Sequence, residues 1–201
     1  MPIIDSWFPT LVYTHNLSSD EETNLYLKNR ALQLKEEYSS SSKNQWRCDT
    51  FSTINQYFGY NKDSIEKQLI KLVTNHVLNF SQSFGIKTRD IECTGFWYNV
   101  ASTGNYQEYH VHPENHFSVV YYVQTPKDCG RIVLASPNGS SAFDMKPLPI
   151  SEYNRNSFAT CFYDPIESLL LVFRSNIPHM VETNKSNEDR ISISMNFKFK
   201  G

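Results

Sequence analysis

The segment RISISMNFKFK, residues 190–200, alternates between apolar and polar side chains. The apolar set is Ile191, Ile193, Met195, Phe197 and Phe199, and the polar set is Arg190, Ser192, Ser194, Asn196, Lys198 and Lys200. Successive side chains of a strand point to opposite faces, so the pattern predicts a β-strand whose apolar face packs on helices. The polar face then points into a barrel mouth or to solvent. If it points inward, Arg190 and Ser192 are adjacent donors that could hold a carboxylate.

Short runs of β-branched and aromatic residues precede this segment from Ile91 onward, separated by turn residues. The expected strands are ECTGFWYNV (92–100), YQEYHVH (106–112), FSVVYYVQ (117–124), RIVLAS (131–136), SLLLVF (168–173) and HMVE (179–182). Many short strands at close spacing are typical of an antiparallel sandwich or barrel. The longest irregular stretch, Pro137 to Pro165, is too long for a plain connector, and we expect it to be a lid or loop over a site.

Two helices are expected before residue 90, after a short strand over Ile3 to Tyr13. The first starts near Ser18, where capping residues precede acidic ones, and a loop over Ser39 to Ser42 ends it. Its apolar positions are Leu27, Ala31, Leu34 and Tyr38. The second opens at residues 61–64 and ends at Gly85, a residue suited to a C-cap. Its apolar positions are Ile65, Leu69, Leu72 or Val73, Val77, Phe80 and Phe84.

These elements predict a mainly β fold with flanking α-helices, built on a double-stranded β-helix, or jelly roll. At 201 residues the chain can bury one good core, and we expect a single domain over 1–201. Within it, residues 1–90 would supply a strand and helical support, and residues 91–200 the jelly-roll core.

The composition fits a folded protein with a β-rich or ligand-lined interior, because 39% of residues are apolar and 14% are aromatic. The net charge of −2 predicts no general affinity for nucleic acid or anionic membranes. No stretch approaches transmembrane length. We expect a reduced, cytoplasmic setting, because the cysteines are far apart and form no C-x-x-C pair. They are Cys48, Cys93, Cys129 and Cys161.

The segment EYHVHPENH, residues 108–116, holds three of the six histidines. On one strand, His110 and His112 would project from the same face, roughly 6–7 Å apart at the backbone. That spacing suits two imidazoles converging on one metal ion. Taken alone, an H-x-H pattern fits ordinary polar residues at the end of a strand as well.

More distant residues extend this pattern. Tyr122 lies on the next expected strand, and His179 is followed eleven residues later by Arg190. The constellation resembles the Fe(II)- and 2-oxoglutarate-dependent dioxygenase superfamily, on its prolyl-hydroxylase-like branch. The signature of that superfamily is H-x-D/E, then a distal His, then an Arg that is often followed by x-Ser. The motifs WFPT, W-x-N, H-x-H-P, Y-Y and RISISMNF resemble, more narrowly, a small family of 2-oxoglutarate/iron oxygenases of bacteria and phages.

The resemblance implies a site for Fe(II) and 2-oxoglutarate. Such an iron centre needs three protein ligands on one face and open positions for the cosubstrate and O₂. The implied ligands are His110, His112 and His179. The implied contacts of 2-oxoglutarate are Arg190 and Ser192 at its far carboxylate, Tyr122 at the same carboxylate, and Asn99 near the metal.

Some of these residues admit a structural role instead, since Tyr122 could be barrel core and Asn99 could cap a turn before Gly104. We expect His116 to support the site or lie on the surface, and Trp97 to be part of the core. His76 falls within the second helix, where a packed or half-exposed histidine is expected.

The chain departs from the superfamily signature at one position, because His112 stands where a carboxylate is usual. Either the site has three histidines, or Glu114 supplies the carboxylate. We predict the three-histidine site, because Glu114 follows Pro113, which cannot donate to a sheet and marks the end of the strand.

The function expected from this resemblance is that of an Fe(II)- and 2-oxoglutarate-dependent oxygenase. It would convert 2-oxoglutarate and O₂ to succinate and CO₂ and hydroxylate a second substrate, either a protein side chain or a small molecule. No membrane or nucleic-acid partner is expected, and a homodimer is an open alternative. The competing readings are a non-catalytic jelly-roll module that binds a metal or a sugar, and a three-histidine zinc hydrolase.

Overall fold

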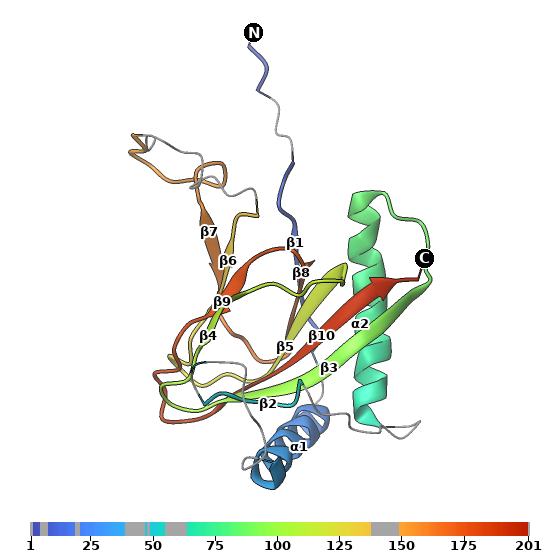
Figure 1. The fold of residues 1–201 in the computed structure, drawn as a ribbon, viewed down its shortest axis with the longest axis vertical. Helices are drawn as coiled ribbons and strands as arrows, with labels where there is room; N and C mark the ends of the chain where they lie inside the picture. Colours follow the sequence, from blue (N-terminus) through green and yellow to red (C-terminus); the bar gives the residue numbers. More distant parts are fainter. Residues whose placement is uncertain are drawn as a thin grey trace.

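The computed structural model describes residues 2–4, 8–18, 21–38, 47, 49–54, 64–137 and 149–200. Two helices, one short 3-10 helix and the strands of two antiparallel sheets follow one another along the chain (Figure 1). They are β1 (Val12–Asn16), α1 (Glu21–Tyr38), β2 (Phe51–Ser52), α2 (Ile65–Ser81), η1 (Gln82–Phe84), β3 (Ile91–Ala101), β4 (Gln107–His110), β5 (Phe117–Gln124), β6 (Ile132–Ala135), β7 (Thr160–Tyr163), β8 (Leu169–Arg174), β9 (His179–Val181) and β10 (Arg190–Phe199).

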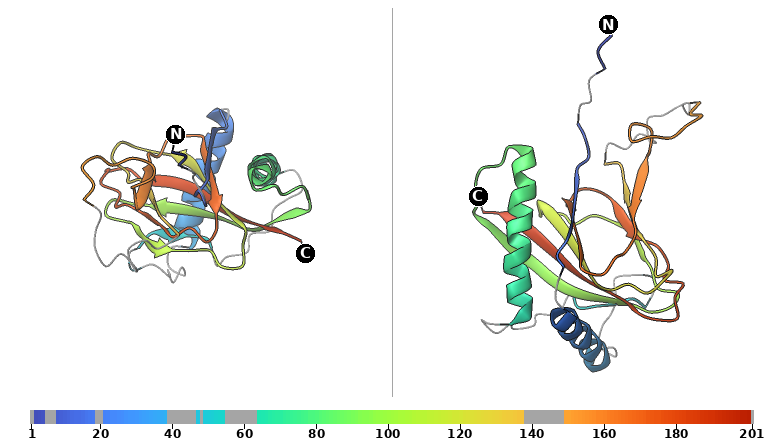
Figure 2. Two further views of the ribbon diagram at one scale, coloured as in Figure 1. Left: turned by 90° about the horizontal axis from the view of Figure 1, so that it is seen from above. Right: turned by 180° about the vertical axis from the view of Figure 1, so that it is seen from behind.

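The larger sheet has the strand order β1-β8-β5-β10-β3-β2, and the smaller one has the order β4-β9-β6-β7. Both helices lie against the larger sheet, and the smaller sheet lies on the other side of it (Figure 2). This is the predicted mainly β fold with flanking helices around a jelly-roll core.

Strand β10 has the two faces that its alternation predicted. Ile193 and Met195 are fully buried in the main core, together with Leu27 of α1 and Val77 of α2. The opposite face carries Arg190, whose side chain lines a cavity between the two sheets. The helices therefore support the back of the strand whose front carries polar groups.

The predicted helix signals are largely confirmed. The Ser64 hydroxyl caps α2 by accepting a hydrogen bond from the Lys67 backbone N–H, and Gly85 adopts a left-handed φ of 75° after η1. Val73, rather than the exposed Leu72, faces the core. The predicted loop at 39–42 and helix start at 61–63 lie outside the described residues.

Two predicted boundaries are wrong. The first strand starts at Val12 instead of Ile3. The stretch from Pro137 to Pro165 is not irregular throughout, because it contains β7, which pairs with β6. The side chains of β7 are mostly exposed, so they lack the apolar alternation that identifies a half-buried strand. Residues 138–148 of the expected lid lie outside the described part of the chain.

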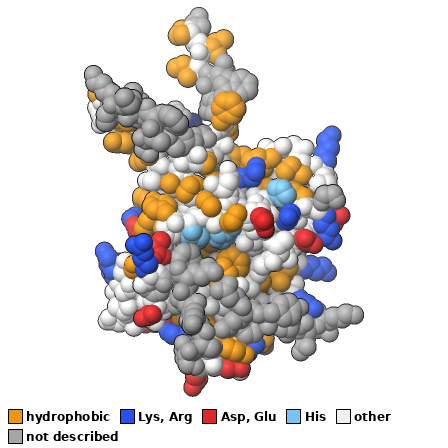
Figure 3. Space-filling view, viewed as in Figure 1, with side chains coloured by type: hydrophobic (Ala, Val, Ile, Leu, Met, Phe, Trp, Pro, Cys, Tyr) orange, Lys and Arg blue, Asp and Glu red, His pale blue; other side chains and the backbone are white. Residues whose placement is uncertain are grey.

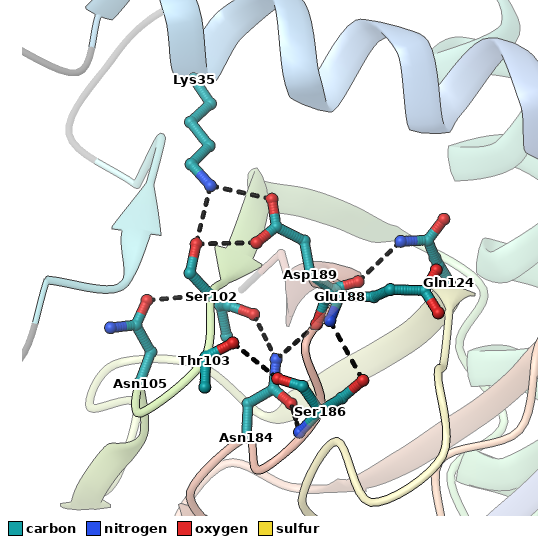
Figure 4. Close-up of polar contacts among 10 residues, drawn as sticks. Lys35, Ser102, Thr103, Asn105, Gln124, Asn184, Ser186, Glu188 and Asp189 are labelled. Carbon is teal, nitrogen blue, oxygen red and sulfur yellow. Dashed lines mark hydrogen bonds and ion pairs between the residues drawn. The ribbon is translucent and has the colours of Figure 1, made fainter.

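A polar network joins α1 to the start of β10 (Figure 4). Lys35 Nζ donates to Asp189 Oδ2 and to Ser102 Oγ, each at 2.8 Å, and Ser102 Oγ donates to Asp189 Oδ1 at 2.7 Å. Asn184 ties the loop before β10 to the end of β3 by donating to the Ala101 carbonyl. Asp189 directly precedes Arg190, so this network fixes the point at which Arg190 enters the sheet.

Candidate metal centre and cosubstrate cavity

A cavity of about 380 Å³ lies between the two sheets. Side chains of β3, β5, β8 and β10 line it from the larger sheet, and side chains of β4, β6 and β9 line it from the smaller one. Histidine side chains gather on the face of the molecule shown in Figure 3, with hydrophobic side chains beside them. The cavity brings together most of the residues that the sequence singled out.

Three histidines lie together at this cavity. Two belong to the paired strands β4 and β9, and the third lies in the segment that follows β4. His110 is the last residue of β4, His179 is the first residue of β9, and the two are register partners. His112 lies two residues beyond β4, so the expectation that it shares a strand with His110 is wrong. Its backbone N–H instead donates to the Ser175 carbonyl at 3.0 Å. His112 still lines the cavity after the strand has ended.

The three imidazole rings are close enough to share one ion. Ring centroids are 5.2 Å apart for His110 and His112, 4.2 Å for His110 and His179, and 5.0 Å for His112 and His179. One ring nitrogen from each residue lies within 4.8 Å of the other two.

Hydrogen bonds at Nδ1 orient all three rings. Nδ1 of His110 donates to the Glu108 carbonyl at 2.7 Å, and Nδ1 of His179 donates to the Ile177 carbonyl at 2.9 Å. A carbonyl oxygen only accepts, so the proton must be on Nδ1, and Nε2 carries the lone pair. Nδ1 of His112 lies 2.7 Å from Asn196 Oδ1 and fits the same arrangement.

Burial keeps these imidazoles neutral. It lowers the pKa of His110 to about 4 and that of His179 to about 3, and in His179 the neighbouring His110 adds to the effect. Burial lowers the pKa of His112 as well. Neutral imidazole is the form that binds a metal, so the group fits a divalent cation near neutral pH.

Glu114 lies apart from this group. It is exposed in the turn after Pro113, has a φ of 66°, and does not line the cavity. Among the described residues, the cluster with metal-ligand spacing contains the three histidines alone.

Arg190 lies in the same cavity and is only 2% exposed. Its Nη1 donates to the carbonyls of Cys129 and Gly130 at 3.0 and 3.3 Å. Tyr122 and Ser192 line the cavity too. Burial raises the pKa of Tyr122, with the positive charge of Arg190 acting in the opposite direction, so the phenol remains a hydrogen-bond donor.

Gly130 helps to hold Arg190 in place. Its φ is 87°, a conformation that L side chains rarely adopt, and a Cβ at this position would overlap the Glu182 backbone carbonyl. The close approach of the two chain segments thus requires glycine, and one of the carbonyls that hold the guanidinium belongs to this residue.

Asn99 faces the interior, but it is not among the residues lining the cavity. Its Nδ2 donates to Ser194 Oγ at 3.0 Å, while its buried Oδ1 has no hydrogen-bond partner among the described residues. Trp97 is buried and also lines the cavity, with its ring 5.5 Å from that of His112.

Two of the other three histidines form hydrogen bonds that connect elements of the fold. His116 Nδ1 accepts the Phe199 backbone N–H at 3.1 Å and so secures the end of β10. His76 bonds to the Tyr13 hydroxyl at 2.8 Å, on the helix side of the sheet.

Sequence reasoning missed the polar residues behind His112. They are Ser118 of β5, Ser175 after β8, and Asn196 of β10. The alternation of residues 190–200 placed Asn196 on the polar face, but no local signal links it to a histidine 84 positions away.

Comparison with known proteins supplies a family. A model of the family described as "Putative 2OG-Fe(II) oxygenase" matches residues 95–196, just over half of the chain. None of the curated proteins matches.

Several solved structures share the fold. A Pseudomonas putida prolyl-4-hydroxylase is 14% identical with a TM-score of 0.66, over 96% of this chain and 94% of that one. A viral collagen prolyl hydroxylase from Paramecium Bursaria Chlorella virus-1 is 11% identical with a TM-score of 0.61, over 94% and 96%. The carbocyclase SnoK of nogalamycin biosynthesis is 7% identical with a TM-score of 0.67, over 94% and 80%.

The described helices include none that is long and apolar enough to cross a bilayer.

Proposed function

The chain belongs to the 2OG-Fe(II) oxygenase family, and on that basis we propose that His110, His112 and His179 hold the iron while Arg190 binds 2-oxoglutarate. Membership makes the protein a 2-oxoglutarate-dependent oxygenase, as the sequence predicted. When bound, the iron supplies the oxidising chemistry with O₂, in which 2-oxoglutarate is decarboxylated to succinate and a second substrate is hydroxylated.

Hydrogen bonds within the protein orient the three histidine rings in the absence of metal. Each histidine has its Nδ1 directed at an oxygen, so its Nε2 lone pair is available toward the other two. The observation that carries the assignment is that one ring nitrogen from each of the three histidines lies within 4.8 Å of the other two. Three ligands on one face leave room for the cosubstrate and O₂.

The cosubstrate is held by charge and by hydrogen bonds. The Arg190 guanidinium binds the far carboxylate, and the Tyr122 phenol and the Ser192 hydroxyl donate to it. Val120, Ile132 and Phe173 also line the cavity, and apolar surroundings strengthen a charge-assisted hydrogen bond. Asn99 does not line the cavity, but it donates a hydrogen bond to Ser194 Oγ, and Ser194 does line it. Asn99 therefore supports the cosubstrate site indirectly, by holding Ser194.

The second substrate is a protein side chain or a small molecule. It reaches the histidines past Ile54 and Val111, which line the cavity and are 42% and 43% exposed, and past the exposed Pro113. The named activities of two structural relatives, both prolyl hydroxylases, support the first class. A screen of peptides and metabolites scored by succinate formation would identify it.

The chain functions as a single domain in a reducing compartment such as the cytoplasm. The main core includes side chains of α1 and α2 together with those of β3, β5 and β10, which supports one folding unit over 1–201. The described cysteines, Cys93, Cys129 and Cys161, are free, and Cys48 lies outside the described residues. A homodimer stays a prediction.

Thermal unfolding separates this proposal from its alternatives. With Mn(II) as an inert substitute for iron, 2-oxoglutarate at 100 times its dissociation constant should stabilise the fold by about 2.7 kcal/mol. It should have little effect without metal. Stabilisation by zinc alone, with no response to 2-oxoglutarate, would favour the binding module or the zinc hydrolase.

A further inference from the structure

The three histidines differ in what holds them. His110 and His179 donate to backbone carbonyls two residues earlier in their own segments, so their tautomers are fixed by the main chain. Nδ1 of His112 contacts only side chains, namely Asn196 Oδ1 at 2.7 Å and Ser118 Oγ at 3.0 Å. A hydroxyl can donate or accept, so the position of the His112 proton depends on which partner dominates.

The neighbouring hydroxyls decide in favour of the amide oxygen. Ser118 Oγ donates to Asn196 Oδ1 at 3.1 Å and lies 2.8 Å from Ser175 Oγ. An amide oxygen only accepts, so the 2.7 Å contact with Asn196 Oδ1 places the proton on His112 Nδ1. Ser175 can then donate to Ser118 and Ser118 to Asn196 Oδ1, while the Ser118 oxygen lies 3.0 Å from the same Nδ1–H. The amide oxygen has two lone pairs and can accept both protons.

This network is part of the rigid sheet. Asn196 and Ser118 are register partners on β10 and β5, and Ser118 and Ser175 are buried. The backbone N–H of His112 is bound to the Ser175 carbonyl. The acceptor for His112 is thus positioned by the paired strands β5 and β10, and not by the segment in which His112 lies.

We propose that Asn196 is the positioning residue that fixes His112 as the Nδ1–H tautomer, with Ser118 and Ser175 holding its amide oxygen in place. The proposal rests on the proposed metal site. Without the amide oxygen, the Ser118 hydroxyl donates to His112 Nδ1 instead, the ring proton moves to Nε2, and the lone pair needed by the metal is lost. A supporting contact of this kind changes metal affinity by about 10- to 100-fold.

The test compares three variants. Asn196→Leu removes the acceptor at similar volume, Asn196→Asp keeps an acceptor, and Asn115→Leu is the matched control. Asn115 lines the same cavity, but its amide bonds to Thr94 and to the Pro113 carbonyl, not to a histidine. The ¹⁵N shifts of the His112 ring in the metal-free protein report the tautomer, and anaerobic calorimetry with Mn(II) reports affinity.

We expect Asn196→Leu to convert His112 to the Nε2–H form and to weaken Mn(II) binding by about 10- to 100-fold. Asn196→Asp should keep the Nδ1–H form and bind Mn(II) at least as tightly as the native protein. Asn115→Leu should have the same tautomer and the same Mn(II) affinity as the native protein. Persistence of Nδ1–H in the leucine variant, or unchanged affinity, would overturn the proposal. If Asn196→Leu does not fold, Asn196→Ala gives the same two readouts.

Failure of the native protein to bind Mn(II) or Fe(II) would refute the proposed function instead. The tautomer measurement on the metal-free variants would still decide the role of Asn196.

Discussion

His110 and His179 face each other across the β4–β9 pair, as register partners whose ring centroids are 4.2 Å apart. Two proposed ligands from distant parts of the sequence are therefore positioned by one backbone pairing. Sites built on paired strands hold their geometry more precisely than sites built on loops. The third histidine, His112, lies outside the strands, and the first prediction concerns this proposed ligand.

His112→Ala should abolish tight metal binding, whereas Glu114→Ala should retain most of it. The alanine at position 112 removes one of the three converging nitrogens, while Glu114 is exposed and outside the cluster. Anaerobic titration with Fe(II) should show a loss greater than about 100-fold for the first variant, more than the loss of a supporting hydrogen bond. The reverse result would make Glu114 the third ligand and restore a two-histidine, one-carboxylate site.

Arg190→Ala should weaken 2-oxoglutarate binding severely while metal still binds. Loss of one partner of a buried charged hydrogen bond costs on the order of 2–5 kcal/mol in binding. Calorimetric titration of 2-oxoglutarate with Mn(II) present measures it. The control is Arg155→Ala, which removes an exposed arginine from the turn before β7. Equal affinity in both variants would remove Arg190 from the cosubstrate site.

Gly130→Ala should destabilise the fold and weaken 2-oxoglutarate binding together. The added Cβ overlaps the Glu182 carbonyl, so the segment that presents carbonyls to Arg190 must move. Overpacking of this kind costs about 1–3 kcal/mol. Gly104→Ala is the matched control, because Gly104 has a similar φ of 86° but open space around its Cβ position. A loss of stability no larger than that of Gly104→Ala, with normal 2-oxoglutarate affinity, would contradict this view.

Stability of the metal-free protein should fall as the solution is acidified. The pKa of His179 is about 3 in the folded protein, against about 6.5 in an unfolded chain. Between these two pH values the unfolded state binds more protons than the folded state. The contribution of neutral His179 to stability is therefore complete above about pH 6.5 and declines by about 1.4 kcal/mol per pH unit below it. The difference between native protein and His179→Gln, measured by denaturant unfolding at several pH values, isolates this contribution. A pH-independent difference would show that His179 is not buried as a neutral ring.

Local patterns predicted the larger elements well. The alternation of residues 190–200 gave both faces of β10, and the Ser64 and Gly85 signals bounded the second helical segment. These features follow from short-range geometry, namely the period of a strand and the needs of a helix end.

Long-range features were not predictable in the same way. Strand β7 carries exposed side chains and is held by backbone pairing to β6, which leaves no pattern in its own residues. His112 lies beyond the end of β4, where its backbone N–H donates to the Ser175 carbonyl and its ring contacts Asn196. Both contacts join segments far apart in sequence. Strand spacing suggested that His110 and His112 could share a metal, but the addition of His179 depended on the resemblance, and the geometry of the three rings came from the fold.

The place of β10 between β5 and β3 has a consequence for synthesis. Every other strand of the described residues precedes β10 in the chain, so β5 and β3 lack the strand that joins them until residues 190–199 have left the ribosome. Until then both strands expose open edges, which are sites of mispairing with other chains. The same insertion also delivers Arg190 and Asn196. A nascent chain thus joins the two halves of the larger sheet and completes the cavity lining in one late event, and chaperone demand should be highest just before it.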